Sequence, residues 1–168
     1  MKKIKFGLTA LLVAVYFFSA TAQDQRASPA MTATGTSNGA TITVNYGSPA
    51  VKGRKIWGGL EAYDKVWRTG ANEATTIQFS KDVNIEGKTI KKGKYALFTI
   101  PREGDWTVII NAVPNQWGAY KYDESKNVHT FDVTPEKNAM TERMTFDVSN
   151  KGVVSMSWEK LKVSFKVK

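Results

Sequence analysis

The sequence predicts an all-β protein, an antiparallel β-sandwich or jelly-roll-like fold of about eight or nine short strands. Three observations predict it. Apolar and polar residues alternate with a period of two through most of the chain after Ala40, as in strands with one face on a core and one in water. Turn candidates, most of them containing glycine, separate these segments. Helical spacing is absent apart from a possible single turn over residues 135–140.

The alternating segments of the first half define the first strands. Residues 95–100 are apolar on both faces, which predicts a central strand buried on both sides. Each remaining segment places its apolar residues on one face: Ile42, Val44 and Tyr46; Thr75, Ile77 and Phe79; Val83 and Ile85, followed by a turn and Ile90; and Trp106, Val108 and Ile110.

The second half repeats this pattern. The last segment is the clearest, because lysines and a serine alternate there with apolar residues up to the C-terminus. A break at residues 159–160 separates it from the segment before. The apolar faces are His129, Phe131 and Val133; Met144, Phe146 and Val148; Val154, Met156 and Trp158; and Leu161, Val163, Phe165 and Val167.

Two long segments, residues 47–73 and 111–127, lack convincing alternation but carry many aromatic residues. Loops of this length without secondary structure are uncommon and are often functional. Because aromatic side chains favour burial, we expect both loops to pack onto the body of the domain.

The N-terminus predicts export. Residues 1–22 have the three parts of a cleavable signal peptide: lysines, an apolar stretch of about 13 residues, and Ala20 and Ala22 before a cleavage site. An uncleaved anchor is the alternative, but the stretch is short for a bilayer, and no later segment is long and apolar enough to span one. The protein is therefore expected in the periplasm or outside the cell.

Composition bounds what the mature chain can do. We expect a flexible lead-in over residues 23–39, which could hold an edge strand near Met31, and a single domain over residues 40–168. Losing three signal lysines lowers the net charge from +9 to +6. The chain has no cysteine, which removes disulfides, thiol catalysis and thiolate metal sites. No arginine-rich cluster or metal finger indicates a nucleic-acid partner, and nothing indicates an oligomeric state.

Four stretches resemble the DUF2911 family: residues 53–60, 66–75, 93–101 and 116–123, which read GRKIWGGL, VWRTGANEAT, GKYALFTIP and QWGAYKYD. The resemblance covers the chain from about Ser28 to the C-terminus. It implies an exported β-rich protein of the kind found in Bacteroidetes-type bacteria. It implies no catalytic residue, because no activity is established for the family.

Motifs for catalysis are sparse. The only histidine, His129, lies in phase with Phe131 and Val133, which favours a partly buried structural role over a catalytic or pH-sensing one. One histidine and no cysteine make a transition-metal site improbable. No calcium loop or phosphate-binding glycine motif is present. We therefore assign no catalytic residue, metal ligand or cofactor.

The strongest candidate site is the run Arg68–Glu73, beside Trp67. Arg68 could bind an anion, while Asn72 and Glu73 could bind hydroxyl groups. Aromatic residues in the two loops could stack on a sugar or other small ligand: Trp57, Trp117 and Tyr120. The alternative is an internal network in which Arg68 pairs with Glu73 and Asn72 caps a turn.

Three functions follow. The favoured one is a non-catalytic binding module for a polar or anionic small molecule, a glycan or an envelope partner. The second is a glycosidase-like hydrolase, which needs two loop carboxylates about 5–10 Å apart across a cleft. The third is a structural envelope protein, which would expose an apolar patch or an unpaired edge strand.

Overall fold

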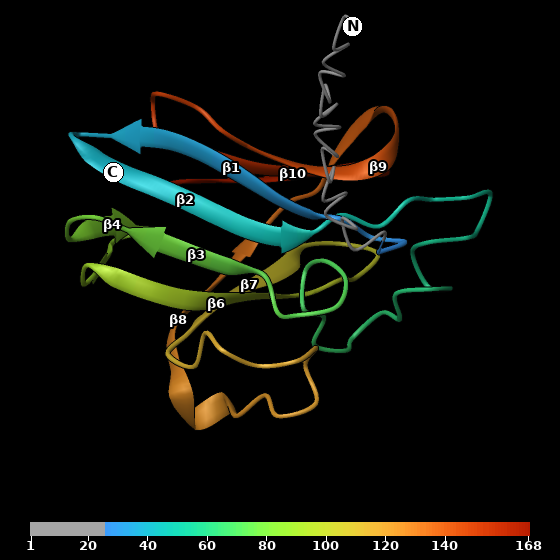
Figure 1. Ribbon diagram of the computed structural model, residues 1–168, viewed down its shortest axis with the longest axis horizontal. Helices are drawn as coiled ribbons and strands as arrows, with labels where there is room; N and C mark the ends of the chain where they lie inside the picture. The colour runs from blue at the N-terminus through green and yellow to red at the C-terminus, as the bar shows by residue number, and fades with distance from the viewer. Residues whose placement is uncertain (1–25) are drawn as a thin grey trace, which may run out of the picture.

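The computed structural model describes residues 26–168, so the predicted signal peptide lies outside the described residues. The described chain is all-β, with ten strands and one short 3₁₀ helix (Figure 1). The elements are β1 (Ala30–Ser37), β2 (Ala40–Gly47), β3 (Thr76–Phe79), β4 (Val83–Ile85), β5 (Lys88–Ile90), β6 (Gly93–Ile100), β7 (Trp106–Asn111), η1 (Glu124–Lys126), β8 (Asn127–Val133), β9 (Glu136–Val148) and β10 (Val153–Lys166).

The strands form two layers that confirm the predicted antiparallel sandwich. A six-stranded sheet has the order β1-β2-β3-β6-β7-β8, and the long hairpin β9–β10 is the second layer (Figure 1). The short hairpin β4–β5 lies beside them. The apolar faces predicted for β2, β3, β7, β9 and β10 meet between the layers and form the main core. Alternation therefore identified the strands because each has one face in this core.

Four of the five tryptophans meet in this core: Trp57, Trp67, Trp106 and Trp158. Their ring centroids lie between 4.7 and 6.4 Å apart, mostly edge to face. Trp57 and Trp67 come from the first long loop. Trp106 is the first residue of β7, and Trp158 lies within β10. The loop is thus anchored by aromatic side chains that contact both layers.

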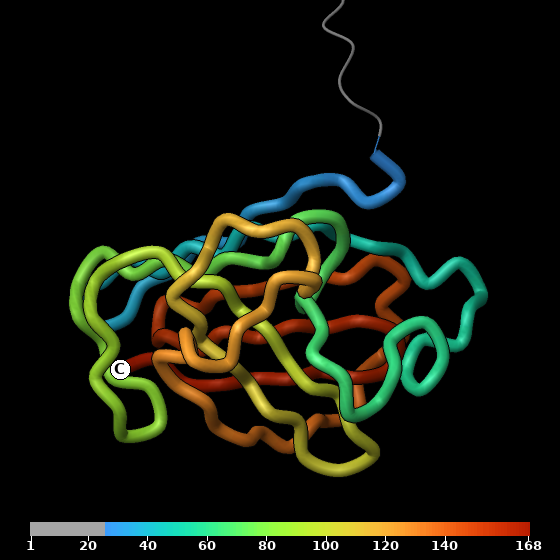
Figure 2. Tube along the Cα trace, turned by 90° about the horizontal axis from the view of Figure 1, so that it is seen from below, coloured from blue at the N-terminus to red at the C-terminus, as the bar shows by residue number. Residues whose placement is uncertain are grey.

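Strand β6 is buried on both faces, as predicted. Leu97 faces the main core, whereas Ala96 and Phe98 on the opposite face belong to a second apolar cluster. Val66 from the first long loop and Tyr122 from the second pack against that cluster. The two long loops therefore form a partial third layer on the outer face of the sheet, and Figure 2 shows both passing across the body of the molecule.

Strand β1 confirms the edge strand expected near Met31 and shortens the expected lead-in. Ala30–Ser37 pairs with β2 along its whole length, so the sandwich starts at Ala30 rather than at Ala40. A Cβ on Gly35 would lie 2.1 Å from the carbonyl oxygen of Val148 in β9. The sequence of β1 is only weakly apolar, because small residues are needed where β1 approaches the backbone of β9.

Two further expectations for the second half are wrong. The possible helical turn at residues 135–140 is instead the start of β9. The expected break at residues 159–160 is an irregularity inside the continuous strand β10, where the register with β9 shifts on both sides of Glu159. Glu159 has a φ of 55°. A β-bulge of this kind adds one residue to the strand and so changes which positions face the core. Trp158 faces the core before the bulge, and Val163 and Phe165 face it after the bulge.

The packing of β1 on β9 predicts a stability effect. Gly35→Ala should lower the free energy of unfolding by about 2–3 kcal/mol, because the new methyl group meets backbone that cannot move aside. Gly104→Ala is the matched control, since a Cβ there meets open space. Urea denaturation followed by tryptophan fluorescence measures both. Equal stability of the two variants would contradict the close packing of β1.

Candidate functional site

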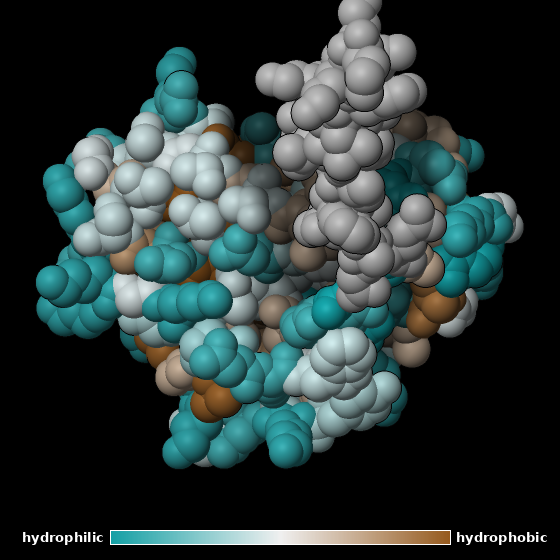
Figure 3. Space-filling model, in the orientation of Figure 1, coloured by the Kyte–Doolittle hydropathy of each residue, from teal (hydrophilic) through white to brown (hydrophobic). Residues whose placement is uncertain are grey.

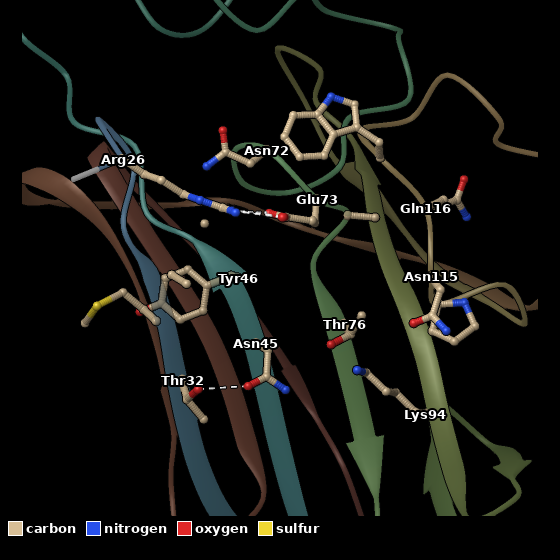
Figure 4. Close-up of a pocket in the computed structure, with 16 residues that line it drawn as sticks. Arg26, Thr32, Asn45, Tyr46, Asn72, Glu73, Thr76, Lys94, Asn115 and Gln116 are labelled. Carbon is tan, nitrogen blue, oxygen red and sulfur yellow. Dashed lines mark hydrogen bonds and ion pairs between the residues drawn. The ribbon is translucent and has the colours of Figure 1, made fainter. Parts of the chain in front are cut away.

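A hollow of about 600 Å³ opens on the outer face of the six-stranded sheet, where the covering loops end (Figure 4). Its floor is formed by β1, β2, β3 and β6, and its walls by residues 72–74 and 114–117 together with Arg26. Thr32, Asn45 and Thr76 lie in register across β1, β2 and β3. The floor is therefore a row of polar side chains on the face opposite the core.

The two long loops meet at one wall of the hollow. The backbone N–H of Ala74 donates to the carbonyl of Gln116, and the N–H of Gly118 donates to the carbonyl of Asn72, both at 3.0 Å. Glu73 and Trp117 face each other in this short antiparallel ladder. The ladder therefore brings Glu73 of the first loop and the neighbouring Gln116 and Trp117 of the second loop to one hollow, although the two loops are far apart in the sequence.

An ion pair spans the rim between β1 and the first loop. The Nη1 atom of Arg26 donates to both carboxylate oxygens of Glu73, at 2.8 and 3.0 Å, and Figure 4 shows the two side chains pointing toward one another. Arg26 lies shortly before β1 in the sequence. Because β1 is part of the sheet, its position brings Arg26 next to the first loop. The pair joins the N-terminal segment of the described chain to the wall of the hollow.

Several polar groups on the hollow carry no hydrogen bond within residues 26–168. The Oγ1 atom of Thr76 is buried without a partner. Asn45 accepts from Thr32 at 2.8 Å through Oδ1, and its amide nitrogen lies on the side toward β3 in Figure 4. Buried hydrogen-bonding groups are almost always satisfied by protein, water or ligand. These groups are therefore available to a bound molecule.

Three of the six predicted site residues line the hollow: Asn72, Glu73 and Trp117. Asn72 donates from Nδ2 to the carbonyl of Ser28 at 3.1 Å, which ties the loop to the segment before β1. Trp117 is 58% exposed, although tryptophan usually favours burial. Its exposure at the rim makes it suitable as a stacking surface.

The other three predicted residues lie elsewhere. Trp57 is 8% exposed and belongs to the four-tryptophan core cluster, so it cannot serve as a platform at the surface. Tyr120 is 86% exposed and does not line the hollow. Arg68 does not pair with Glu73; its charge acts on Glu61, and its Nε atom is buried without a partner among the described residues.

The turn after Arg68 explains this separation. Thr69 and Asn72 both have left-handed backbone, with φ of 52° and 65°. The buried Thr69 hydroxyl lies 3.1 Å from that of Thr99, and Thr75 donates to the Thr69 carbonyl at 2.8 Å. The turn therefore forms an internal network, as the alternative interpretation expected, but with threonines in place of an Arg68–Glu73 pair.

Sequence reasoning missed the residues of the floor. Arg26 was hidden in the expected lead-in, and Thr32, Asn45, Thr76 and Lys94 are ordinary polar positions on the water-facing side of strands. The alternation gave their face correctly. Because strand order joins β1, β2, β3 and β6, only the topology brings these positions together.

Burial raises the pKa of Glu61 to about 7, although the nearby Arg68 and Arg54 oppose the rise. The Arg54 guanidinium is directed to backbone carbonyls, at 3.0 Å from Val51 and 2.5 Å from Ala50. Glu61 itself is fixed in the loop by backbone hydrogen bonds to Gly58 and Ile56. The carboxyl group is consequently held in a partly desolvated position that favours its neutral form.

His129 is partly buried on β8, and its Nε2 atom lies 3.0 Å from the carbonyl oxygen of Ile85. Burial lowers its pKa below the ordinary value. Its ring also packs on Phe131 at 5.1 Å. These contacts support the structural role for His129, joining the β4–β5 hairpin to β8.

The described residues include no helix long and apolar enough to cross a membrane. Residues 26–168 also contain no group of three or more histidine and carboxylate residues that could hold a metal ion. A family model described as "Protein of unknown function (DUF2911)" matches residues 28–167. No curated protein and no solved structure matches the chain.

Glu61 predicts a pH dependence of stability. Its pKa is higher in the folded chain than the ordinary 4.5, so the folded state binds more protons between about pH 4.5 and 7, and stability falls as pH rises through this range. Glu61→Gln should remove this slope and stabilise the protein by about 1–3 kcal/mol near pH 8. Urea denaturation across this pH range measures it.

His129→Gln is the control for this measurement. A lowered histidine pKa makes stability fall as pH decreases below about 6.5, the opposite direction. This variant should therefore keep the slope caused by Glu61. An unchanged pH profile in Glu61→Gln would show that Glu61 is not desolvated.

Proposed function

The chain belongs to the DUF2911 family, and we propose that it is an exported, non-catalytic binding module that holds a small polar ligand in the hollow. One observation carries the proposal. Polar side chains converge, beside an exposed tryptophan, on a single hollow of about 600 Å³, and two buried groups of its lining, the Thr76 hydroxyl and the Gln116 Oε1 atom, have no hydrogen-bond partner in residues 26–168. Sites for small molecules commonly have this size and a few convergent polar groups.

The lining chemistry favours a ligand rich in hydroxyl groups. Amide groups of Asn45 and Asn115 and the hydroxyl of Thr76 can each donate and accept. Hydroxyl groups of a ligand have the same dual character, so they match these side chains better than a purely anionic or apolar molecule. Trp117 adds a flat apolar surface against which a ring can stack.

The hydrolase alternative gains no support at the hollow. Of the described residues that line it, Glu73 alone carries a carboxylate, and this group is bound by Arg26. Glycoside hydrolysis ordinarily needs two carboxyl groups across the scissile bond. The lining therefore favours binding over this chemistry.

The structural-envelope alternative expects an exposed apolar patch or an unpaired edge strand, and β1 and β8 are the edge strands of the six-stranded sheet. On the face drawn in Figure 3, hydrophilic side chains predominate, and hydrophobic residues form small separate patches. The exposed large apolar residues among residues 26–168 come from scattered segments, such as Met31 in β1, Leu60 in the first loop and Met140 in β9. Single exposed apolar residues are ordinary for a protein surface, so they favour no docking partner.

Two exposed aromatic residues test the proposal. Trp117→Ala should weaken binding about tenfold or more, because it removes the stacking surface, whereas Tyr120→Ala, outside the hollow, should bind like the parent chain. NMR titration of the mature chain with a panel of monosaccharides, disaccharides, polyols and amino acids provides the measurement. Absence of any shift at Asn45, Thr76 and Trp117 across the panel would refute the proposed function.

Thr76→Val is a second test at the floor. The substitution removes an unpaired buried hydroxyl and keeps the shape of the side chain, so stability should be unchanged or slightly higher. Affinity for a panel compound that binds the hollow should fall about fivefold to tenfold. Calorimetry for binding and thermal unfolding for stability separate the two effects. A large loss of stability would show that the hydroxyl serves the fold instead.

A further inference from the structure

The positive and negative side chains that line the hollow do not balance. Among the described residues that line it, Arg26, Glu73 and Lys94 carry charge. Arg26 and Glu73 form an ion pair at the rim. Lys94, an exposed side chain on β6, has no ion-pair partner within residues 26–168, whereas Lys91 in the turn before β6 is paired with Asp82 at 2.9 Å. The described lining therefore carries one uncompensated positive charge, and it lies on the floor.

The position of Lys94 places its positive charge where a ligand in the hollow can contact it. It lies on β6 opposite Gln78 of β3, one step along the same face from the Thr76–Ala96 pair. Figure 4 shows its ammonium group reaching from β6 toward β3, near Thr76, and Asn115 lies on the same side. An anionic group there would accept charge-assisted hydrogen bonds from both the Lys94 ammonium group and the Thr76 hydroxyl.

The other groups exclude a bare inorganic anion as the best occupant. Lys94 is the only cation of the described lining that is not ion-paired within it, because the Arg26 guanidinium is bound by Glu73, and no helix N-terminus lies there. Amide and hydroxyl groups occupy the middle of the floor, and Trp117 stands at the wall. A molecule that satisfies all three regions needs one anionic group, several hydroxyl groups and a ring with an apolar face.

We propose that the ligand is an acidic saccharide, a short oligosaccharide that carries a carboxylate or sulfate group. Its anionic group binds Lys94, its hydroxyl groups bind Asn45, Thr76 and Asn115, and one sugar ring stacks on Trp117. The hollow of about 600 Å³ can accommodate about two sugar rings. This inference rests on the proposed function and specifies its ligand class.

Matched ligands test the acid group. Calorimetry of the mature chain with a disaccharide of galacturonic acid, the corresponding disaccharide of galactose and a sulfated disaccharide compares acidic with neutral sugars. At least one acidic disaccharide should bind about tenfold or more tightly than the neutral one, and added salt should weaken the acidic complex alone. Sodium acetate and sodium sulfate should not bind measurably.

Matched lysines test the position. Lys94→Gln should lower the affinity for the acidic disaccharide about tenfold and leave the affinity for the neutral disaccharide unchanged. Lys94→Arg should keep most of the affinity for the acidic disaccharide. Lys92→Gln is the control, because Lys92 is exposed like Lys94 and lies two residues before it but does not line the hollow. Trp117→Ala should weaken both disaccharides.

Each failure has a distinct meaning. Equal affinity for acidic and neutral disaccharides, or no effect of Lys94→Gln, would overturn the acidic class while the proposed binding function stands. Binding of a non-saccharide polyol or amino acid, with no disaccharide bound, would overturn the saccharide class alone. If no compound of any panel shifts the resonances of the hollow, both the ligand class and the proposed function fail.

Discussion

Two backbone hydrogen bonds between the long loops, Ala74 to Gln116 and Gly118 to Asn72, determine the arrangement of the outer surface. They hold the loops against each other on the outer face of the sheet, where Ala96 and Phe98 need cover. The cover stops at this ladder, and the floor beyond it remains open. The hollow therefore lies where the apolar part of the sheet's outer face, which the loops cover, ends and a polar part that is exposed to solvent begins.

The first long loop is held from within by two different interactions. Trp57 and Trp67 enter the aromatic cluster of the main core, which supplies apolar burial without disulfides. The turn at Thr69 has a left-handed backbone that is costly for a β-branched residue. Hydrogen bonds with Thr99 and Thr75 offset that cost. The strained turn sends Arg68 to one side of the loop and Asn72 and Glu73 to the other.

This division gives the loop two electrostatic environments. On one side Glu61 is desolvated near Arg68, and its pKa is raised to about 7. On the other side Glu73 is half exposed and paired with Arg26. Glu61 and Glu73 therefore lie in different environments although they belong to the same loop, because their burial and their neighbours differ. The strong perturbation at Glu61 lies outside the hollow, consistent with an origin in packing rather than ligand chemistry.

The sequence by itself determined the strands of the sandwich, the double burial of β6 and the packing of both long loops, because period-two alternation and aromatic content are local signals of burial. It also gave Asn72, Glu73 and Trp117 as candidate site residues. Tertiary structure alone decided that Trp57 is core, and that Arg68 does not line the hollow but acts by its charge on Glu61. It alone assembled Asn45, Thr76 and Lys94 into one floor, since strand order and long-range pairing are not encoded in the pattern of any single strand.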